Sequence, residues 1–295
     1  AILKNALDSG YTGEIYPINP KESEILGLPC KKTIGEIPGT DLAVICLPAH
    51  LVPGVMEECG RAGTRNVIVI SAGFKEVGKQ GAELEQRVVE ICRRYGMNML
   101  GPNCLGMIDT HTPLNASFAP DMPKKGEIAF ISQSGAFGTA ILDWSIANNV
   151  GFSKFISLGN KGDLDEIDFI EDAANDPYTK VILCYLESIN RGREFCEVVA
   201  RATRKKPVLV LKSGTSEAGV RAASSHTGAL AGNDLAYDAA FLQTGVLRVR
   251  SAEELFDLAL VFATQPLPEG RRVALVTNAG GPGIVATDAV ERCGL

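Results

Sequence analysis

His226 lies in the stretch of this chain whose residue types could most readily take part in chemistry. It lies in the segment Ala223-Ser224-Ser225-His226-Thr227-Gly228-Ala229-Leu230-Ala231-Gly232, where small and hydroxyl side chains leave room for a phosphate-sized group to reach the ring. Imidazole ionises near neutral pH and can act as a base, an acid or a nucleophile. The sequence has only two other histidines, His50 and His111. From the local sequence alone, an ordinary loop histidine is the commoner alternative.

A second candidate is the turn Ser132-Gln133-Ser134-Gly135-Ala136, which joins an apolar run to a helical pattern. A strand-to-helix turn directs free backbone N–H groups and the positive end of the helix toward a ligand, so it can bind an anion. The two hydroxyl groups of Ser132 and Ser134 and the small Gly135 could therefore hold phosphate. The alternative is that a serine simply caps the helix.

Glu187 is the third candidate, at the end of the run Val181-Ile-Leu-Cys-Tyr-Leu-Glu-Ser188. A carboxylate at the carboxyl end of a buried strand faces the functional edge of a parallel sheet. It could hydrogen-bond one histidine nitrogen, fix the tautomer and leave the other nitrogen nucleophilic. The alternative is a solvated glutamate at the end of a strand.

Three early loops follow strand-like runs and contain small residues that would let a nucleotide-like ligand approach closely. They are Leu47-Pro48-Ala49, Ser71-Ala72-Gly73-Phe74 and Gly101-Pro102-Asn103-Cys104-Leu105-Gly106. Small residues are also common in such loops of any Rossmann fold. Lys21, just after Asn19-Pro20, could neutralise a phosphate or could be a surface lysine.

Alternating apolar runs and amphipathic stretches must position these residues. In the first part of the chain we expect strands at Glu14–Ile18, Leu42–Leu47, Val67–Ile70 and Asn98–Leu100, and helices at His50–Ala62 and Ala82–Tyr95. After a proline-rich connector at 119–126, we expect strands at Glu127–Ser132, Phe152–Leu158, Val181–Leu186 and Val208–Leu211. Runs of Val and Ile without polar alternation indicate strands buried on both faces, so the class is α/β with parallel sheets.

A third unit follows the connector Gln265-Pro266-Leu267-Pro268-Glu269-Gly270 and repeats the start of the second. The segment from Ile128 to Gly138 aligns without gaps with the segment from Val273 to Gly283, and each has the pattern of a buried strand, a glycine turn and a helix. The repeat predicts two related flavodoxin-like domains. The alternative is that both segments are generic strand-to-helix turns.

Composition limits the function further. The 295 residues suggest about two domains, and a hydrophobic content of 45% with 22% charged residues is typical of a soluble globular protein. The net charge of −6 argues against nucleic-acid binding. No apolar run is long enough to cross a membrane, and no signal peptide is visible. The eight scattered cysteines form no C-x-x-C pair, which argues against a zinc site or disulfides and favours a reducing cytoplasm.

The chain begins with Ala1-Ile-Leu-Lys-Asn, already helical in pattern, and stops at Leu295 after another helical stretch. We therefore expect a fragment that is cut at both ends.

Taken together, the segments resemble the nucleoside-diphosphate-forming acyl-CoA synthetases. The ADP-forming acetate–CoA ligases are the nearer branch, and succinyl-CoA synthetase is the more distant. The resemblance covers nearly the whole chain, and the order and spacing of its motifs are specific although no single motif is. The residues that carry it are Tyr16–Lys21, Ile70–Phe74, Gly101–Cys104, Ile131–Ala136 and Ser225–Ala229.

The resemblance implies a Rossmann-like CoA-binding domain over 1–122, its first strand missing. A flavodoxin-like doubly wound domain over 123–267 would bear the phosphohistidine, and 268–295 would start a second, truncated flavodoxin-like domain. It implies that His226 is phosphorylated, that Glu187 orients it, and that Ser132, Ser134 and Gly135 hold phosphate. The matching CoA contacts are Lys21, Pro48, Ala49, Ser71, Gly73 and Asn103, with Asn103 near the thioester.

The implied reaction is acyl-CoA + ADP + phosphate ⇌ carboxylic acid, with acetate expected, + CoA + ATP, through an acyl phosphate and a phosphohistidine. CoA, ADP or ATP and phosphate are then substrates, and no metal is expected on this chain because Mg²⁺ belongs to an ATP-grasp module. That module would be fused or a separate beta subunit, in an oligomeric enzyme.

Two features depart from the family pattern. The family's first strand and glycine-rich CoA loop should precede Ala1, so a chain of this extent should bind CoA poorly. The ATP-grasp module is absent as well, so this chain alone should not make ATP.

Two other classes of protein could share parts of this pattern. One is a non-catalytic acyl-CoA-sensing module of a protein acetyltransferase, which typically lacks the histidine; the presence of His226 with Glu187 argues against it. The other is a nicotinamide dehydrogenase, but a single Rossmann domain would not explain the second and third units.

Overall fold

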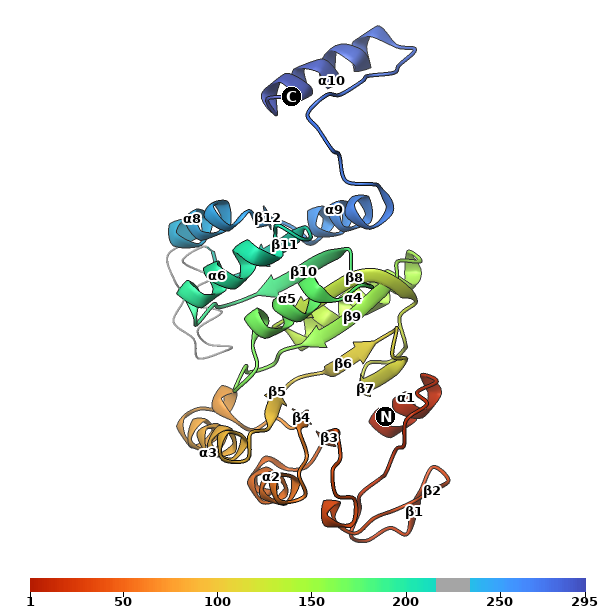
Figure 1. The fold of residues 1–295 in the computed structure, drawn as a ribbon, viewed down its shortest axis with the longest axis vertical. Coiled ribbons are helices and arrows are strands. Elements are labelled where there is room, and N and C mark those ends of the chain that lie inside the picture. Colours follow the sequence, from red (N-terminus) through yellow and green to blue (C-terminus); the bar gives the residue numbers. More distant parts are fainter. Residues whose placement is uncertain (216–233) are drawn as a thin grey trace. The chain divides into compact units, whose positions relative to one another are not determined.

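The structure is a computed structural model that describes residues 1–215 and 234–295. The chain divides into two units, Ala1–Ala263 and Thr264–Leu295. The larger unit contains two separate sheets with parallel strands, which form the frameworks of two α/β domains (Figure 1). The α/β class expected from the alternating apolar and amphipathic segments is therefore confirmed.

The first domain is built on a parallel sheet with the order β3-β4-β5. Its buried side chains pack against the helices α2 and α3. A proline in the first turn favours the start of α2, and Gly96, with φ of 65°, ends α3 in the left-handed conformation that glycine adopts readily. The elements are α1 (Ile2–Asp8), β1 (Glu24–Ile25), β2 (Leu28–Pro29), η1 (Ile34–Glu36), β3 (Leu42–Ile45), η2 (Ala49–Leu51), α2 (Val52–Arg61), β4 (Asn66–Val69), η3 (Lys75–Val77), α3 (Lys79–Tyr95) and β5 (Asn98–Leu100).

The strand expected at Glu14–Ile18 is wrong. Only Ile18 makes a β-bridge there, to Lys31, and the rest of the segment has no ladder. Pro17 lies within this stretch and Pro20 follows it, and proline has no N–H to donate to a neighbouring strand. The apolar residues that suggested a strand therefore lie in an irregular segment.

The second domain contains a sheet that, in the described residues, has the order β12-β11-β10-β8-β9-β6-β7. The five strands from β12 to β9 are parallel, whereas β6 and β7 form an antiparallel hairpin at one edge. In chain order the parallel strands are arranged 2-1-3-4-5, which is the flavodoxin-like order expected from the resemblance. The strands are β6 (Gly106–Asp109), β7 (Leu114–Ser117), β8 (Lys125–Ser132), β9 (Phe152–Ser157), β10 (Val181–Leu186), β11 (Val208–Lys212) and β12 (Leu247–Val249).

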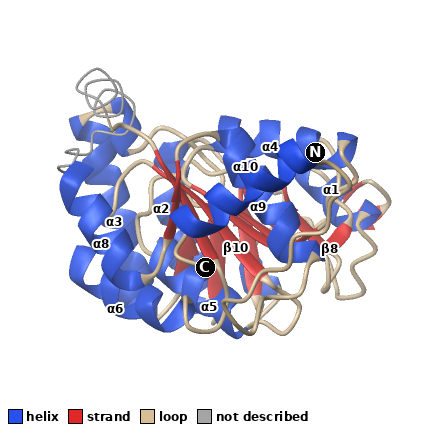
Figure 2. Ribbon diagram, turned by 90° about the horizontal axis from the view of Figure 1, so that it is seen from above, coloured by secondary structure: helices blue, strands red, loops and turns tan. Residues whose placement is uncertain are grey.

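Helices cover both faces of this sheet, and Figure 2 shows the strands as a central layer between them. Alternate residues of each strand face opposite layers. In β8, Ala129 and Ile131 belong to the core under α5 and α6, whereas Ile128 and Phe130 belong to the core under α4 and α9. This explains why the strands lack polar alternation in the sequence. The helices are α4 (Gly135–Ala147), α5 (Glu166–Asn175), α6 (Gly192–Ala202), α8 (Asp234–Thr244) and α9 (Ala252–Thr264).

The smaller unit, Thr264–Leu295, contains the helix α10 (Gly280–Arg292), which agrees with the helix expected from the repeat. The strand expected to begin at Val273 is wrong, because this segment is not in a β-ladder and Val276 is 97% exposed. A strand needs a neighbour to accept its backbone hydrogen bonds, and 264–295 supplies none.

Across 1–215 and 234–295, no helix combines the length and the apolar composition that crossing a bilayer would require.

Candidate functional site

The candidate site lies at the point where the strand order of the second domain reverses. From β8 the chain proceeds to β9 on one side, and it later returns to β10 on the other side. Ser132 at the end of β8 pairs in register with Tyr185 of β10, so the segments that follow these two strands leave the sheet side by side. Ligands of open α/β sheets bind at such a reversal, outside the carboxyl ends of the strands.

The turn after β8 is held by its own hydroxyl groups. Ser132 is fully buried and donates a hydrogen bond of 2.7 Å to the carbonyl oxygen of Ser134. The Ser134 hydroxyl caps α4 by accepting a hydrogen bond of 3.2 Å from the N–H of Phe137. The structure therefore contains the helix cap that was the alternative interpretation of this motif. The cap does not exclude an anion site, because the first N–H groups of an α-helix have no partner within the helix.

Gly135 leaves space at the start of α4. Apart from the neighbouring residues and the backbone of α4 itself, no described atom lies within 4 Å of the place that a Cβ would take on Gly135. Ser134 and Gly135 also line the cavity described below. The predicted role of Ser134 and Gly135 in phosphate binding therefore needs only backbone N–H groups and open space, while the hydroxyl group of Ser132 is committed to the fold.

Glu187 is only 8% exposed, so the alternative of a solvated strand-end glutamate is wrong. Its backbone carbonyl accepts a hydrogen bond of 2.8 Å from Nζ of Lys212. The carbonyl of the next residue, Ser188, accepts one of 2.7 Å from Nζ of Lys161. The two lysines and the sheet thus fix the direction in which the chain leaves β10.

Gln133 joins the two strand ends and was missed by sequence reasoning. Its Oε1 accepts hydrogen bonds from the N–H groups of Glu187 at 2.9 Å and of Ser188 at 3.1 Å. Its Nε2 donates to the Ser188 hydroxyl at 3.2 Å. The only signal for it in the sequence is its position between two serines in the predicted turn.

Lys161 and Glu166 form a buried ion pair beside the site, and sequence reasoning missed this pair as well. Nζ of Lys161 lies 2.9 Å from Oε2 of Glu166, with side chains 2% and 0% exposed. Burial raises the pKa of Glu166, which outweighs the lowering effect of Lys161. The other carboxylate oxygen of Glu166 has no hydrogen-bond partner within the described residues.

A cavity of about 730 Å³ opens beside these groups and is lined by residues of both domains. The first domain and the β6–β7 region contribute Ile70, Ala72, Lys75, Glu76, Asn103, Cys104, Leu105 and Phe118. The second domain contributes Gln133, Ser134, Gly135, Ala136, Thr139, Gly159, Asn160, Lys161, Ser188 and Asn190. Of the predicted site residues, Ser134, Gly135 and Asn103 therefore face one cavity.

The predicted CoA loops of the first domain lie together at the carboxyl ends of β3, β4 and β5. The Ser71 hydroxyl accepts a hydrogen bond of 3.0 Å from the N–H of Leu47, and the Ser71 carbonyl accepts one of 2.9 Å from the N–H of Asn103. Gly73 has φ of 107°, and a Cβ there would lie 3.0 Å from that of Ala49. Close contact of the loops therefore requires glycine at this position.

Other predicted residues do not line the cavity. Pro48, Ala49, Ser71 and Gly73 are in the adjoining loops but outside its lining. Lys21 is exposed in a turn where the Asn19 side chain accepts a hydrogen bond of 2.9 Å from the Lys21 N–H. The structure therefore brings the three loops together and does not bring Lys21 into the cavity.

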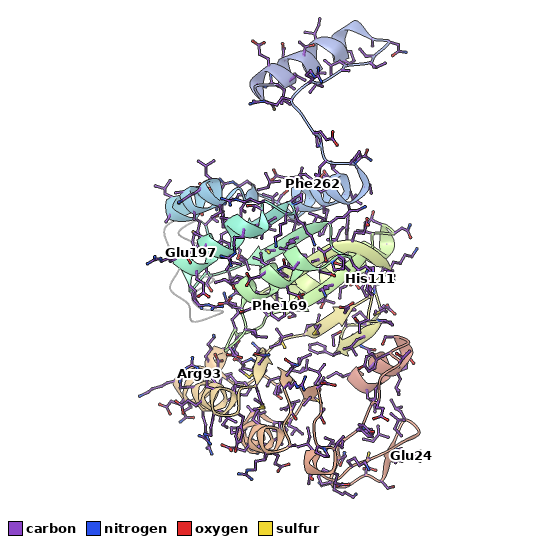
Figure 3. All side chains as sticks on the ribbon, in the orientation of Figure 1. Glu24, Arg93, His111, Phe169, Glu197 and Phe262 are labelled. Carbon is purple, nitrogen blue, oxygen red and sulfur yellow. The ribbon has the colours of Figure 1, made fainter. Side chains whose placement is uncertain are left out.

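His226 lies outside the described residues. Of the other histidines, His50 is exposed in η2. His111, labelled in Figure 3, lies in the β6–β7 turn, where its ring stacks on Tyr178 at 4.0 Å and its Nε2 is 3.1 Å from the Gly126 carbonyl oxygen. Neither residue lines the cavity.

In 1–215 and 234–295, no group of three or more His, Cys, Asp or Glu side chains is arranged to hold a metal ion. The expectation that Mg²⁺ belongs to another module thus stays a prediction.

Comparison with known proteins gives matches along the whole chain. A CoA binding domain family matches residues 1–110, and a family described as the succinyl-CoA ligase like flavodoxin domain matches residues 125–262. The chain is 51% identical over its full length to acetate–CoA ligase [ADP-forming] I of Archaeoglobus fulgidus, of which it covers 42%. It is 48% identical to the alpha subunit of acetate–CoA ligase [ADP-forming] I of Pyrococcus furiosus, of which it covers 65%.

Among solved structures, the chain resembles a dinucleotide forming acetyl-coenzyme A synthetase 1 of Ca. Korarchaeum cryptofilum in complex with phosphate and ADP. The TM-score is 0.94 and the identity 44%, over 99% of this chain and 63% of that one. The chain thus spans between about two fifths and two thirds of the length of these relatives.

Proposed function

The chain belongs to the nucleoside-diphosphate-forming acyl-CoA synthetases, and on that premise we propose that it is the CoA-binding and phosphoryl-relay part of an ADP-forming acyl-CoA synthetase. The expected acid is acetate, by similarity to relatives named as acetate–CoA ligases. The relatives reported above are ligases, which gives no support to the acyl-CoA-sensing alternative.

One observation carries this proposal. The turn Ser132–Ala136 after β8, called the phosphate turn below, and the loop 101–106 after β5, called the Asn103 loop, line the same cavity of about 730 Å³. The segment that follows β10 begins with Glu187, and the N–H of Glu187 is hydrogen-bonded to Gln133 in the phosphate turn. A thioester held by the first domain would therefore meet a phosphate held by the second.

The proposed reaction has three steps. A phosphate oxygen attacks the thioester carbonyl carbon, the C–S bond breaks, and CoA leaves as the thiol with an acyl phosphate remaining. A nitrogen of His226 then attacks the phosphorus, and the carboxylate leaves. In the last step, ADP accepts the phosphoryl group from His226 in an ATP-grasp module that we propose is a fused domain or beta subunit.

Residues of this chain would act mainly by position and charge. Backbone N–H groups at the start of α4 would neutralise phosphate without a bulky cation. Glu187 would hydrogen-bond one nitrogen of His226 and stabilise the charge that develops on the ring. Lys21, Pro48, Ala49, Ser71, Gly73 and Asn103 stay proposed CoA contacts, and Ser132 would support the phosphate turn.

The test uses the complete enzyme with its ATP-grasp part. Incubation with acetyl-CoA and ³²P-labelled phosphate should give an acid-labile label that is lost in His226→Asn. In Glu187→Gln, the rate of labelling should fall by about 10²-fold, which is the lower end of the effect of a positioned acid or base. His111→Asn, which changes a histidine outside the cavity, should retain the label. An unlabelled wild-type enzyme, or undiminished label in His226→Asn, would disprove the phosphohistidine.

A further inference from the structure

A loop of the second domain runs directly along the exit of β5 in the first. This loop follows β9, and its N–H groups at Asn160, Gly162 and Leu164 donate hydrogen bonds of 2.8 to 3.1 Å to carbonyl oxygens between Met99 and Pro102. Gly159, with φ of 58°, begins the contact, because a Cβ there would lie 2.4 Å from the Pro102 carbonyl oxygen. The backbone of the loop thus attaches the two domains beside the cavity.

The side chain of Asn160 forms hydrogen bonds with three residues that precede the second domain's parallel strands. Its Oδ1 accepts from Nδ2 of Asn103 at 3.2 Å. Its Nδ2 donates to Glu76 at 2.7 Å and to Glu85 at 2.8 Å. Since ionised carboxylates only accept hydrogen bonds, these partners fix which end of the amide faces which group. The backbone carbonyl oxygen of Asn160 also accepts a hydrogen bond from Nζ of Lys75.

Glu76 extends this contact to another of the proposed CoA loops. Its Oε1 accepts hydrogen bonds from the N–H groups of Gly73 at 2.5 Å and Phe74 at 3.1 Å. Burial alone would raise the pKa of Glu76, but the hydrogen bonds from Asn160 and Gly73 outweigh burial and lower it. Glu76 is therefore an ionised acceptor that links Asn160 to the Ser71–Phe74 loop.

We propose that Asn160 is a positioning residue that sets the acyl-CoA loops of the first domain against the phosphate turn of the second. It contacts the Asn103 loop directly and the Ser71–Phe74 loop through Glu76. Asn160 lines the same cavity as Ser134 and Gly135. The inference rests on the proposed function, because it assumes that these loops hold CoA.

Attack of phosphate on a thioester needs reacting atoms about 3 to 3.5 Å apart, and a displacement of about 1 Å can cost 10²-fold in rate. Asn160→Asp replaces the donor that faces Glu76 and Glu85 with a third carboxylate oxygen. The resulting repulsion should push the loops away from the phosphate turn while the rest of each domain keeps its fold. We therefore expect a selective loss of the acyl-CoA half-reaction.

The experiment compares two routes to phosphohistidine in the complete enzyme. Labelling from acetyl-CoA and ³²P-phosphate should slow by about 10²-fold in Asn160→Asp. Labelling from γ-³²P-ATP, which does not need the CoA loops, should stay within about twofold of wild type, as an unaltered site requires. Asn175→Asp makes the same chemical change at an exposed position at the end of α5 and should leave both routes unchanged.

A second variant repairs the contact with Glu76 and leaves the new carboxylate facing Glu85. Asn160→Asp combined with Glu76→Gln exchanges donor and acceptor, because the new amide can donate to the new carboxylate. The glutamine oxygen can still accept from Gly73 and Phe74. This double variant should recover at least about tenfold of the lost acyl-CoA rate, in the way that coupled pairs are non-additive.

Three results would overturn the inference. They are a normal acyl-CoA route in Asn160→Asp, an equal fall of both routes, and a double variant no faster than Asn160→Asp. If Asn160→Asp does not fold, Asn160→Ser, which removes the donor without adding charge, is measured by the same two routes and must show the same selective loss. A wild-type enzyme that labels by neither route would refute the proposed function instead, so the two failures are distinguishable.

Discussion

The side-chain oxygen of Gln133 accepts a hydrogen bond of 2.9 Å from the backbone N–H of Glu187. The two residues follow the neighbouring strands β8 and β10 and are 54 positions apart in the sequence. The same oxygen accepts from the N–H of Ser188 at 3.1 Å. One amide therefore connects the phosphate turn to the chain that carries the proposed partner of His226. A displacement of the phosphate turn would therefore also displace Glu187.

Gln133→Ala should destabilise the fold and slow phosphohistidine formation. It leaves the N–H groups of Glu187 and Ser188 without their acceptor, and an unsatisfied buried donor costs about 1 to 3 kcal/mol. We expect a loss of about 2 kcal/mol in urea unfolding, within that range. Labelling from acetyl-CoA and phosphate should fall about 10²-fold from the displaced geometry.

The matched control for Gln133→Ala is Ser188→Ala, which removes only the contact of the hydroxyl with Nε2 of Gln133. Its effect on stability should stay below about 1.5 kcal/mol, the net worth of an ordinary hydrogen bond. If both variants behave alike, the two backbone hydrogen bonds are not what positions the strand end.

Two substitutions of Ser134 separate helix capping from anion binding. Ser134→Ala removes the cap on Phe137 and should cost about 1 kcal/mol in unfolding free energy. Ser134→Asp keeps a good capping side chain but places a negative charge where phosphate is proposed to bind. We expect near wild-type stability and a KM for phosphate raised at least about tenfold, equivalent to 1.4 kcal/mol. An unchanged KM in Ser134→Asp would exclude phosphate from this turn.

The ion pair of Lys161 and Glu166 should show strong non-additivity. Lys161→Met leaves a fully buried carboxylate without its partner, which typically costs about 3 to 5 kcal/mol. Lys161→Met combined with Glu166→Leu removes both charges, and replacing a whole buried pair by apolar side chains is often neutral. We therefore expect the double variant to be more stable in urea unfolding than the single variant.

Lys180 and Glu127 provide the exposed comparison, with 2.8 Å between charged atoms and side chains 57% and 44% exposed. Lys180→Met should change stability by less than about 1 kcal/mol. A double Lys161→Met, Glu166→Leu variant as unstable as Lys161→Met alone would show that lost packing, and not the unpaired charge, causes the effect.

Lys212 should make stability rise with pH in the alkaline range. Burial lowers the pKa of Lys212 from 10.5 to about 8, and Nζ lies 4.6 Å from the ring centroid of Tyr237. Between these two pH values the unfolded chain binds a proton that the folded chain has lost. Stability from this group therefore increases as pH rises from about 8 to 10.5.

The measurement is the difference in unfolding free energy between wild type and Lys212→Met from pH 7 to pH 10.5, which cancels the titration of other groups. This difference should move in favour of wild type as pH rises. Lys205→Met, at an exposed position, controls for the loss of a lysine. A difference that does not change with pH would contradict the lowered pKa.

The sequence predicted the class of fold and much of the framework of the site, because the strongest signals were local. The buried runs that became β8 and β10 had no polar alternation, and the glycine turn after β8 preceded a helical pattern. These features place the segment after Ser132 and the segment that begins at Glu187 at one edge of a parallel sheet. The hairpin β6–β7 was not predicted because its strands, Gly-Met-Ile-Asp and Leu-Asn-Ala-Ser, lack the apolar runs that mark β3 and β4.

Two expected strands failed for related physical reasons. The segment at Glu14–Ile18 contains a proline and makes only one bridge, and the segment beginning at Val273 has no neighbour in 264–295. Apolar character shows that a segment could be a strand, but hydrogen-bond partners decide whether it becomes one.

The sequence by itself determined the α/β class, the residue types suited to phosphoryl transfer and their places at strand ends, since periodicity and turn chemistry are properties of neighbouring residues. Only the tertiary structure decided which polar side chains hold those ends together. Asn160 reaches Glu76 across 84 positions of sequence, and Gln133 reaches Glu187 across 54. Such contacts depend on the order of the strands and on the contact between the two domains. The sequence around a single amide side chain has no pattern from which these contacts could be predicted.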